Sequence, residues 1–234
     1  MRRPLIFSRP TLTKSEVTRQ RLLEAAVEIF GQRGLEGATV REIARASGQN
    51  VAAIAYHFGS KERLYAAVLE EAVREIRHRL NDVLADMTRL REQPAPSRAQ
   101  ATAVLQRFLR AIYTRFLSQK EAVALGRLIV REQMQPTGAF DLIYEQGFRT
   151  IHEGLCWLLG VILNEDAQAA RTIIRTHSLM GQVYFFAMSR ETVRRRLRWK
   201  ELDGRNAEFV ADVIEENVDL LLGGLAARPE KKRR

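Results

Sequence analysis

Three side chains with the chemistry of phosphate contacts stand close together in this chain. Tyr56 and His57 are adjacent, and Lys61 follows four residues later. Each can donate a hydrogen bond to a phosphate oxygen, a contact that sets the register of a protein on DNA but carries little sequence information. For Tyr56 and His57 the alternative is a packing role. We expect the same phosphate contacts from Thr39 and Arg41, which come earlier in the chain.

The residues just before this cluster favour a simple kind of base reading. Val51, Ala52 and Ala53 are apolar and small, so they cannot form bidentate hydrogen bonds but can contact thymine methyl groups in the major groove. Asn50 is the side chain best able to hydrogen-bond a base edge, and its alternative role is that of a plain helix cap. We therefore predict readout through DNA shape and thymine methyl groups.

Two short helices are expected to position these side chains. Thr39 can cap the first helix by accepting a backbone N–H, and Gly48 can end it because glycine tolerates the positive φ of a helix C-terminus. Asn50 can cap the second helix, which continues to Ala55. Two helices joined by a short turn that contains glycine form a helix-turn-helix, and the second helix enters the major groove of DNA.

The same segment resembles a known family. Residues 46–65 resemble the DNA-binding signature of TetR-type transcriptional regulators. The family's first helix and the loop after it are matched by Leu22, Leu23, Ala26, Ile29, Phe30, Gly34 and Thr39. Two positions depart from the pattern: Gln49 replaces a small apolar turn residue, and Ala55 replaces a tyrosine that contacts DNA in many members. The resemblance implies a regulator that responds to a small molecule and most often represses by occluding a promoter, although the residues leave activation open.

The length and composition predict two domains, and the absence of a convincing alternating strand pattern predicts that both are all-α. A chain of 234 residues with 46% hydrophobic content can bury a second core beyond a DNA-binding module. We expect a basic arm at 1–13, a three-helix DNA-binding domain at 14–60, a helical effector-binding and dimerisation domain at 61–225, and a basic tail at 226–234. The expected helices beyond the helix-turn-helix cover 14–32, 61–91, 98–117, 120–133, 138–163, 166–189 and 206–222.

The helix expected at 61–91 is the longest. Its apolar residues recur at alternating spacings of four and three, which predicts one stiff helix that packs within the chain; a coiled coil between chains is the alternative. A linker follows at 93–97, where Pro94 and Pro96 exclude a continuing helix. A ligand that favours one position of this long helix would change the distance between two recognition helices, so ligand and operator would antagonise each other.

The excess positive charge is local. The net charge is +10, and residues 1–60 hold nine basic against five acidic residues, residues 190–200 six against one, and residues 228–234 five against one. This distribution indicates a polyanionic partner near the N-terminal domain, and simple solubility is the alternative. For residues 190–200 a solvated basic face is the usual explanation, and a second DNA site is the alternative.

The second half of the chain resembles the C-terminal domain of the CecR-like (YbiH-like) branch of the TetR regulators. The resemblance rests on residues 131–137, 181–186 and 194–199. It implies an effector pocket, and a homodimer through the last two long helices. Pocket candidates are Phe108, Ile112, Phe148 and His152, each with ordinary core packing as the alternative; Arg131 is a candidate for an anionic ligand or for a plain ion pair.

Dimerisation is also expected from the size of a recognition helix. One such helix reads only a few base pairs, so useful specificity requires a two-fold dimer on a palindromic operator, with recognition helices about 34 Å apart. The expected partners are therefore double-stranded DNA, a second copy of the chain and an unidentified small-molecule effector.

Other classes of protein find little support in the residues. There is no nucleophile elbow, phosphate-binding loop or dinucleotide-binding motif, so we expect neither an enzyme nor a cofactor. The pair His152-Glu153 opens like a zinc-binding helix, but position 156 is cysteine instead of histidine, and we expect no metal site. Cys156 is the single cysteine, and the longest uncharged apolar run has ten residues, which together indicate a cytoplasmic protein without a membrane span.

Overall fold

The computed structural model describes residues 13–117 and 123–226, apart from the side chains of residues 116, 117, 123, 187, 188 and 226. All regular structure in these residues is helical, which confirms the predicted all-α class. The basic arm and the basic tail expected from the sequence lie almost wholly outside the described residues. The helices in chain order are α1 (Lys14–Gly37), α2 (Val40–Ser47), α3 (Val51–Phe58), α4 (Lys61–Arg79), α5 (Asn81–Arg91), α6 (Arg98–Ile112), α7 (Val123–Met134), α8 (Phe140–Ile143), α9 (Arg149–Leu163), α10 (Ala170–Arg196) and α11 (Gly204–Ala226), with π-helical turns η1 (Tyr113–Leu117) and η3 (Tyr144–Phe148).

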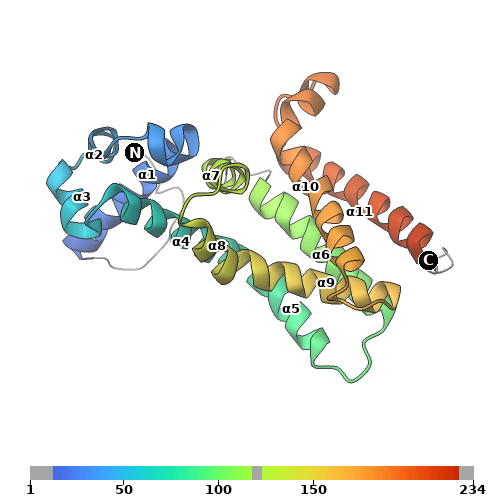
Figure 1. Cartoon of the computed structure of the whole chain (residues 1–234). Helices are drawn as coiled ribbons and strands as arrows, with labels where there is room; N and C mark the ends of the chain where they lie inside the picture. Colours follow the sequence, from blue (N-terminus) through green and yellow to red (C-terminus); the bar gives the residue numbers. More distant parts are fainter. Residues whose placement is uncertain (1–12, 118–122, 227–234) are drawn as a thin grey trace. The chain divides into compact units, whose positions relative to one another are not determined.

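The chain divides into two compact units (Figure 1). The first unit comprises residues 1–78 and 119–148, and the second comprises residues 79–118 and 149–234. The first unit therefore contains α1 to α4 together with α7, α8 and η3, so a segment from the middle of the chain joins the N-terminal helices.

In the first unit, the helix α1 packs on α7, α2 and α3. Thr13 caps it by accepting the Glu16 backbone N–H, and Glu16 accepts the N–H of Thr13 in return. Phe30 is fully buried and meets the ring of Tyr65 from α4 edge to face, with centroids 4.9 Å apart. The helical backbone is interrupted at Gly34, where φ is 73° and ψ is −180°, close to the predicted end at residue 32, and helical residues follow as far as Gly37. Glycine adopts this positive φ without a steric cost.

The single long helix expected at 61–91 is wrong, because the chain breaks at Leu80. This residue has φ −104° and ψ 5° and separates α4 from α5. The break frees the carbonyl of Arg79, and Arg115 Nη1 donates to it at 3.2 Å while both Nη atoms of Arg115 hold the Asp82 carboxylate. The break also allows complete burial of the Leu80 side chain. The apolar spacing is similar on both sides, so the sequence pattern gave no sign of this break.

The second unit is built around α6, which packs on α5, α9 and α11. Figure 1 shows α6, α10 and α11 running beside one another. The buried side chains at the contacts of α6, α9 and α11 are aliphatic or aromatic: Leu105, Phe108, Leu109, Ile112, Leu155, Leu158, Leu159, Val210, Ile214 and Val218. These residues recur at helical spacings of three and four, so each helix turns one apolar face toward the core.

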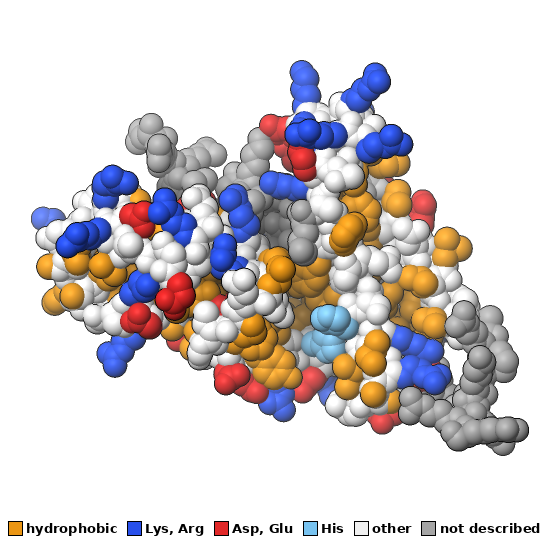
Figure 2. Space-filling view, turned by 45° about the horizontal axis from the view of Figure 1, so that its top comes forward, with side chains coloured by type: hydrophobic (Ala, Val, Ile, Leu, Met, Phe, Trp, Pro, Cys, Tyr) orange, Lys and Arg blue, Asp and Glu red, His pale blue; other side chains and the backbone are white. Residues whose placement is uncertain are grey.

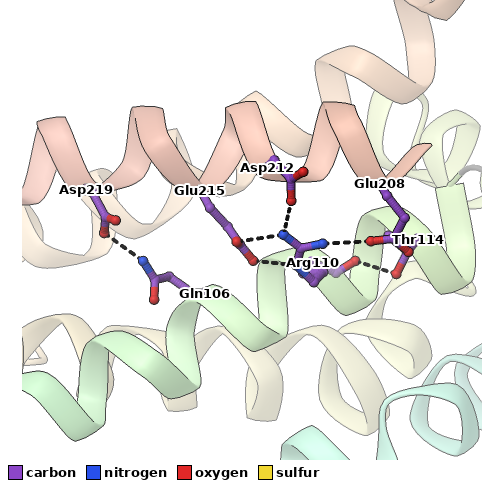
Figure 3. Close-up of polar contacts among 7 residues, drawn as sticks. All are labelled: Gln106, Arg110, Thr114, Glu208, Asp212, Glu215 and Asp219. Atoms are coloured by element: carbon purple, nitrogen blue, oxygen red, sulfur yellow. Dashed lines mark hydrogen bonds and ion pairs between the residues drawn. The ribbon is translucent and has the colours of Figure 1, made fainter. Parts of the chain in front are cut away.

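Arg110 links α6 to α11 through hydrogen bonds and ion pairs (Figure 3). Arg110 donates through Nε and Nη2 to the Glu215 carboxylate at 2.7 and 2.8 Å and through Nη1 to Glu208 at 2.6 Å, and it also pairs with Asp212. These acidic residues follow the helical repeat along one face of α11. The carboxylates, Glu215 first, raise the pKa of Arg110 above its already high value, so this guanidinium keeps its charge at any ordinary pH.

Candidate DNA-binding interface

The helix α2 begins with a reciprocal cap. Thr39 Oγ1 accepts the Glu42 backbone N–H at 3.3 Å, and the Glu42 carboxylate accepts the Thr39 backbone N–H at 3.1 Å and the Thr39 hydroxyl at 2.9 Å. These bonds from Thr39, with the hydroxyl contributing most, lower the pKa of Glu42. The carboxylate stays charged at the N-terminal end of α2, where negative charge is favourable.

The turn between α2 and α3 has the conformation that the sequence predicted. Gly48 lies in the left-handed region at φ 68° and ψ 26°, and the Gln49 N–H donates to the Ala44 carbonyl at 2.9 Å. Asn50 then caps α3, since its Oδ1 accepts the Ala53 N–H at 2.8 Å. The predicted helix-turn-helix is therefore confirmed.

The two faces of α3 differ in burial. Ile54 is 2% exposed and Phe58 8% exposed, and these side chains anchor the helix to the rest of the unit. On the outer face Val51 and Ala52 are exposed, and Tyr56 is 82% exposed, with its ring edge-on to that of His57 at 4.9 Å. A tyrosine so exposed contributes little to the core, so the structure leaves it available for a partner.

The phosphate-contacting candidates on α2 and α4 lie close together. Lys61 Nζ donates to the Ala38 carbonyl at 3.3 Å, which brings its ammonium beside Thr39 at the start of α2. Arg41 is exposed one residue into α2, and Arg45 is exposed one turn further along. Figure 2 shows Lys and Arg side chains distributed over this part of the first unit. Arg45 was not among the predicted contacts, although its spacing of four from Arg41 could have indicated it.

Asn50 has the capping role that the sequence left open, and its contact with a base edge stays a prediction. Its Oδ1 is engaged by the cap, whereas no hydrogen bond of its Nδ2 group to another described residue is found. A bidentate contact with adenine needs both the amide oxygen and the amide nitrogen. With the cap in place, Oδ1 keeps one lone pair and Nδ2 keeps its donors, so the amide can still contact a base edge or a phosphate oxygen.

The sequence gave no indication that α7 packs against the DNA-binding helices. A β-carbon at Gly31 of α1 would lie 3.0 Å from the carbonyl oxygen of Ala124, so only glycine allows α7 to approach this closely. Arg131 Nη2 donates to the Gln32 carbonyl at 3.1 Å, and its side chain lies against Gly34. The contact fixes α7 at the kink of α1.

A buried carboxylate joins α7 to α4. Glu132 is fully buried and accepts hydrogen bonds from Tyr65 Oη at 2.5 Å and from the N–H and hydroxyl of Thr137 at 2.8 Å each. Burial, and then Glu132, raises the pKa of Tyr65. One signal could have predicted this site, because Glu132 continues the buried helical repeat of Leu125 and Leu128.

The five expected effector residues fall in different units. Phe108, Ile112 and His152 belong to the second unit, and Arg131 and Phe148 belong to the first. Phe108 and Ile112 are buried in the core, while His152 is half-buried, with its pKa lowered by burial and by the neighbouring His177. No finding tests their role in effector binding, which stays a prediction.

A cavity of about 460 Å³ in the second unit has a different lining, formed by Val83, Arg107, Arg110, Ala111, Thr114, Arg115 and Glu208. Over the described ranges, no group of three or more His, Cys, Asp or Glu side chains is arranged to hold a metal ion. Among the same residues, no helix has the length and apolarity needed to cross a membrane.

Comparisons with known proteins agree with this geometry. The family model for "Bacterial regulatory proteins, tetR family" matches residues 22–68, and that for "HTH-type transcriptional dual regulator CecR, C-terminal domain" matches residues 101–225. The chain is 36% identical over 223 residues to the HTH-type transcriptional dual regulator CecR of Shigella flexneri, which covers 95% of this chain and 99% of that protein. It is 46% identical over 54 residues to the HTH-type transcriptional repressor AcnR of Corynebacterium glutamicum, covering 23% of this chain and 29% of AcnR.

Solved structures share the fold at low sequence identity. AibR, crystallised in complex with isovaleryl coenzyme A and operator DNA, superposes with a TM-score of 0.60 at 19% identity and covers 86% of this chain and 97% of its own. The ketosteroid transcriptional regulator KstR2 of Mycobacterium tuberculosis gives a TM-score of 0.58 at 19% identity, covering 91% and 96%. The helix-turn-helix, the two matching family models and the relative that spans almost the whole chain agree, so the chain belongs to the TetR family of transcriptional regulators, with a C-terminal domain of the CecR type, and is not an enzyme.

Proposed function

We propose that this regulator is a repressor that binds a palindromic operator as a dimer and leaves it when a small molecule binds. The observation that carries the proposal is the outer face of α3, where the exposed Val51, Ala52 and Tyr56 follow an N-terminus capped by Asn50. Apolar side chains there fit thymine methyl groups, and the flanking Thr39, Arg41, His57 and Lys61 fit phosphates. A protein with this role works in the cytoplasm, where the chromosome lies.

The last two helices carry the apolar surface that a dimer would cover. Large apolar side chains are exposed on α10 and α11, among them Ile174 at 65%, Phe185 at 67% and Leu220 at 76%. Monomeric proteins rarely expose many large apolar side chains on adjacent helices, and such surfaces commonly mark contacts between proteins. A two-fold dimer through α10 and α11 would present two copies of α3 to successive major grooves, about 34 Å apart.

The effector is proposed to bind in the C-terminal part of the chain. AibR was crystallised with an acyl-coenzyme A and with operator DNA, so a regulator of this fold can hold a small molecule as well as an operator. For this chain the candidates in the second unit are Phe108, Ile112 and His152, and those in the first are Arg131 and Phe148. The lowered pKa of His152 favours the neutral imidazole, which suits contact with a lipophilic ligand.

The first experiment measures binding of the purified protein to labelled DNA from upstream of its own gene, by fluorescence anisotropy at physiological salt. A scrambled duplex of equal length serves as competitor. We expect a preference of about 4 kcal/mol or more for the upstream DNA. Equal binding to both duplexes that collapses as salt rises would contradict a specific operator at that place.

Substitutions connect this binding to the proposed surface. Tyr56→Ala should weaken operator binding, whereas Tyr144→Ala should not, because Tyr144 is an exposed tyrosine of the same unit that lies outside α2 and α3. Size-exclusion chromatography should show the same dimer for both variants. Loss of binding in both, or in neither, would contradict the assignment. A promoter–reporter fusion, measured in cells with and without the regulator, distinguishes repression from activation. Lower reporter expression in cells that lack the regulator would contradict repression.

A further inference from the structure

The C-terminal end of α10 carries a dense group of positive charges. Six basic residues and one acidic residue lie between positions 190 and 200, and Figure 2 shows Lys and Arg side chains crowded over this end of the helix. The helix bends just before them, at Ser189, where φ is −106° and ψ is 17°. We call residues 190–200 the basic tip.

Two of the arginines hold the basic tip together. Glu191 accepts Nε and Nη2 of Arg194 at 2.7 and 2.8 Å and Nε of Arg195 at 2.6 Å, and these contacts, Arg194 first, lower the pKa of Glu191 to about 2. Arg194 Nη1 also donates to the Trp199 carbonyl at 3.1 Å, and the Trp199 ring lies edge-on to that of Phe209 on α11. The chain beyond the helix end is thereby fixed to α10 and α11.

Three other cations of the basic tip have no such partner. Arg196, Arg198 and Lys200 are exposed, and their side chains form no hydrogen bond or ion pair with any residue that the structure describes. The single carboxylate within the basic tip is already occupied by Arg194 and Arg195. Three charges therefore project into solvent from one short, ordered segment.

The conformation of Arg198 adds to this pattern. Its φ is +55°, and it stands where the Trp199 N–H returns to the Arg194 carbonyl at 2.9 Å to close the helix end. Glycine adopts this left-handed conformation without a steric cost and is the usual residue there. The chain has arginine instead, so a cation is present at a position that local structure alone does not favour.

We propose that the basic tip binds the phosphodiester backbone of DNA, independently of base sequence and separately from the helix-turn-helix. Arginine predominates in the basic tip, and its planar guanidinium forms paired hydrogen bonds with phosphate oxygens. DNA is the polyanion that a TetR-family regulator binds. When the protein is bound to one DNA segment, the effective concentration of neighbouring segments around it is high. The basic tip would therefore strengthen residence on DNA or hold a second segment.

A lipid surface fits the basic tip less well. Stable binding to a membrane interface needs an apolar face as well as cations. Leu197, 49% exposed, is the one large apolar side chain that the basic tip exposes among the described residues. Charge without an apolar face is instead the usual composition of a nonspecific DNA contact.

The test measures binding of the full-length protein to a short random-sequence duplex over a series of salt concentrations, so it needs no knowledge of the operator. The tip variant is Arg196→Gln/Arg198→Gln/Lys200→Gln. A control variant, Arg74→Gln/Arg89→Gln/Arg149→Gln, removes the same number of charges from exposed positions on α4, α5 and α9. Circular dichroism and size-exclusion chromatography establish that both variants keep the fold and the assembly of the parent.

Each phosphate contact contributes about 0.9 to the slope of log K against log salt, so loss of three contacts should reduce the slope by about 2.7 per protomer. The control variant should keep the parent slope. Equal slopes for the tip variant and the control variant would overturn the proposal. Tip-dependent sedimentation with phosphatidylglycerol vesicles and no change in the DNA slope would also overturn it, in favour of a lipid surface.

The same variants separate this inference from the proposed function. The tip variant should keep its preference for operator over scrambled DNA, because α3 is unchanged. Tyr56→Ala should lose the preference for operator DNA. Its slope of log K against log salt should still include the contribution of the basic tip, which the tip variant lacks. If Tyr56→Ala abolishes all DNA binding, including the salt-dependent part, the basic tip does not bind DNA by itself and the inference is wrong.

Discussion

Replacing Tyr65 with phenylalanine removes one hydroxyl from the buried contact between α4 and α7. Tyr65 is 1% exposed, and its Oη donates to a Glu132 carboxylate that is fully buried. The ring keeps its edge-to-face contact with Phe30, so the change in packing is small. One carboxylate oxygen loses its hydrogen-bond donor from Tyr65, while the other keeps both donors from Thr137.

The size of the effect follows from the charge of the acceptor. A hydrogen bond to a charged group contributes about 1.5–3 kcal/mol, and an unsatisfied buried acceptor bears its full cost of desolvation. We therefore expect Tyr65→Phe to lower the free energy of unfolding by about 2 kcal/mol. Tyr144→Phe, a change in an exposed tyrosine of the same unit, should stay within about 0.5 kcal/mol of the parent.

Urea unfolding followed by circular dichroism measures both variants, and a double-mutant cycle with Glu132→Gln isolates the pair. A coupling energy of at least about 0.5 kcal/mol is expected for groups in direct contact. If Tyr65→Phe unfolds at the urea concentration of Tyr144→Phe, then Glu132 does not depend on the hydroxyl. The contact between α4 and α7 would then rest on apolar packing alone.

Three further predictions concern other parts of the chain. Gly154→Ala should destabilise the second unit by about 1–3 kcal/mol, because the new methyl group would overlap the sulfur of Met87. In Gly223→Ala the new methyl group meets no atom, so this variant should stabilise α11 by up to about 1 kcal/mol. Thermal unfolding compares the two variants. Because the pKa of His152 is lowered in the folded chain, this side chain takes up a proton more readily in the unfolded chain. The free energy of unfolding should therefore fall as the pH drops below about 6.5. Urea unfolding at several pH values should show a weaker pH dependence for His152→Gln. Thr39→Ala should cost about 1 kcal/mol through loss of the cap of α2, and an unchanged urea midpoint would show that the cap contributes nothing.

The DNA-reading segment could be predicted from the sequence because its determinants are local. Gly48 and Asn50 act on residues within four positions of themselves, and their types alone indicate a helix end and a helix start. The same holds for the outer face of α3, where spacing decides which side chains are exposed. Predictions of this kind need no knowledge of the rest of the fold.

The features that the sequence did not predict depend on residues far apart in the chain. The break at Leu80 is stabilised by Arg115, 35 positions away, and the contact of Arg131 with Gly34 joins residues 97 positions apart. An unbroken helix and a broken one have the same apolar spacing, so periodicity cannot distinguish them. Grouping of α7 with the N-terminal helices likewise depends on a close approach at Gly31 that only the three-dimensional structure reveals.

Two other contacts between distant residues lie in the first turns of α4, and they bear on how an effector could act on DNA binding. Lys61 binds the Ala38 carbonyl at the start of α2, and Tyr65, one turn further along the same helix face, binds Glu132 on α7. A helix turn is stiff, so a displacement of α7 that moves Tyr65 must also move Lys61 or break the buried hydrogen bond. We expect that an effector which favours a displaced position of α7 would also move Lys61, a predicted phosphate contact, and DNA would then affect effector binding by the same factor.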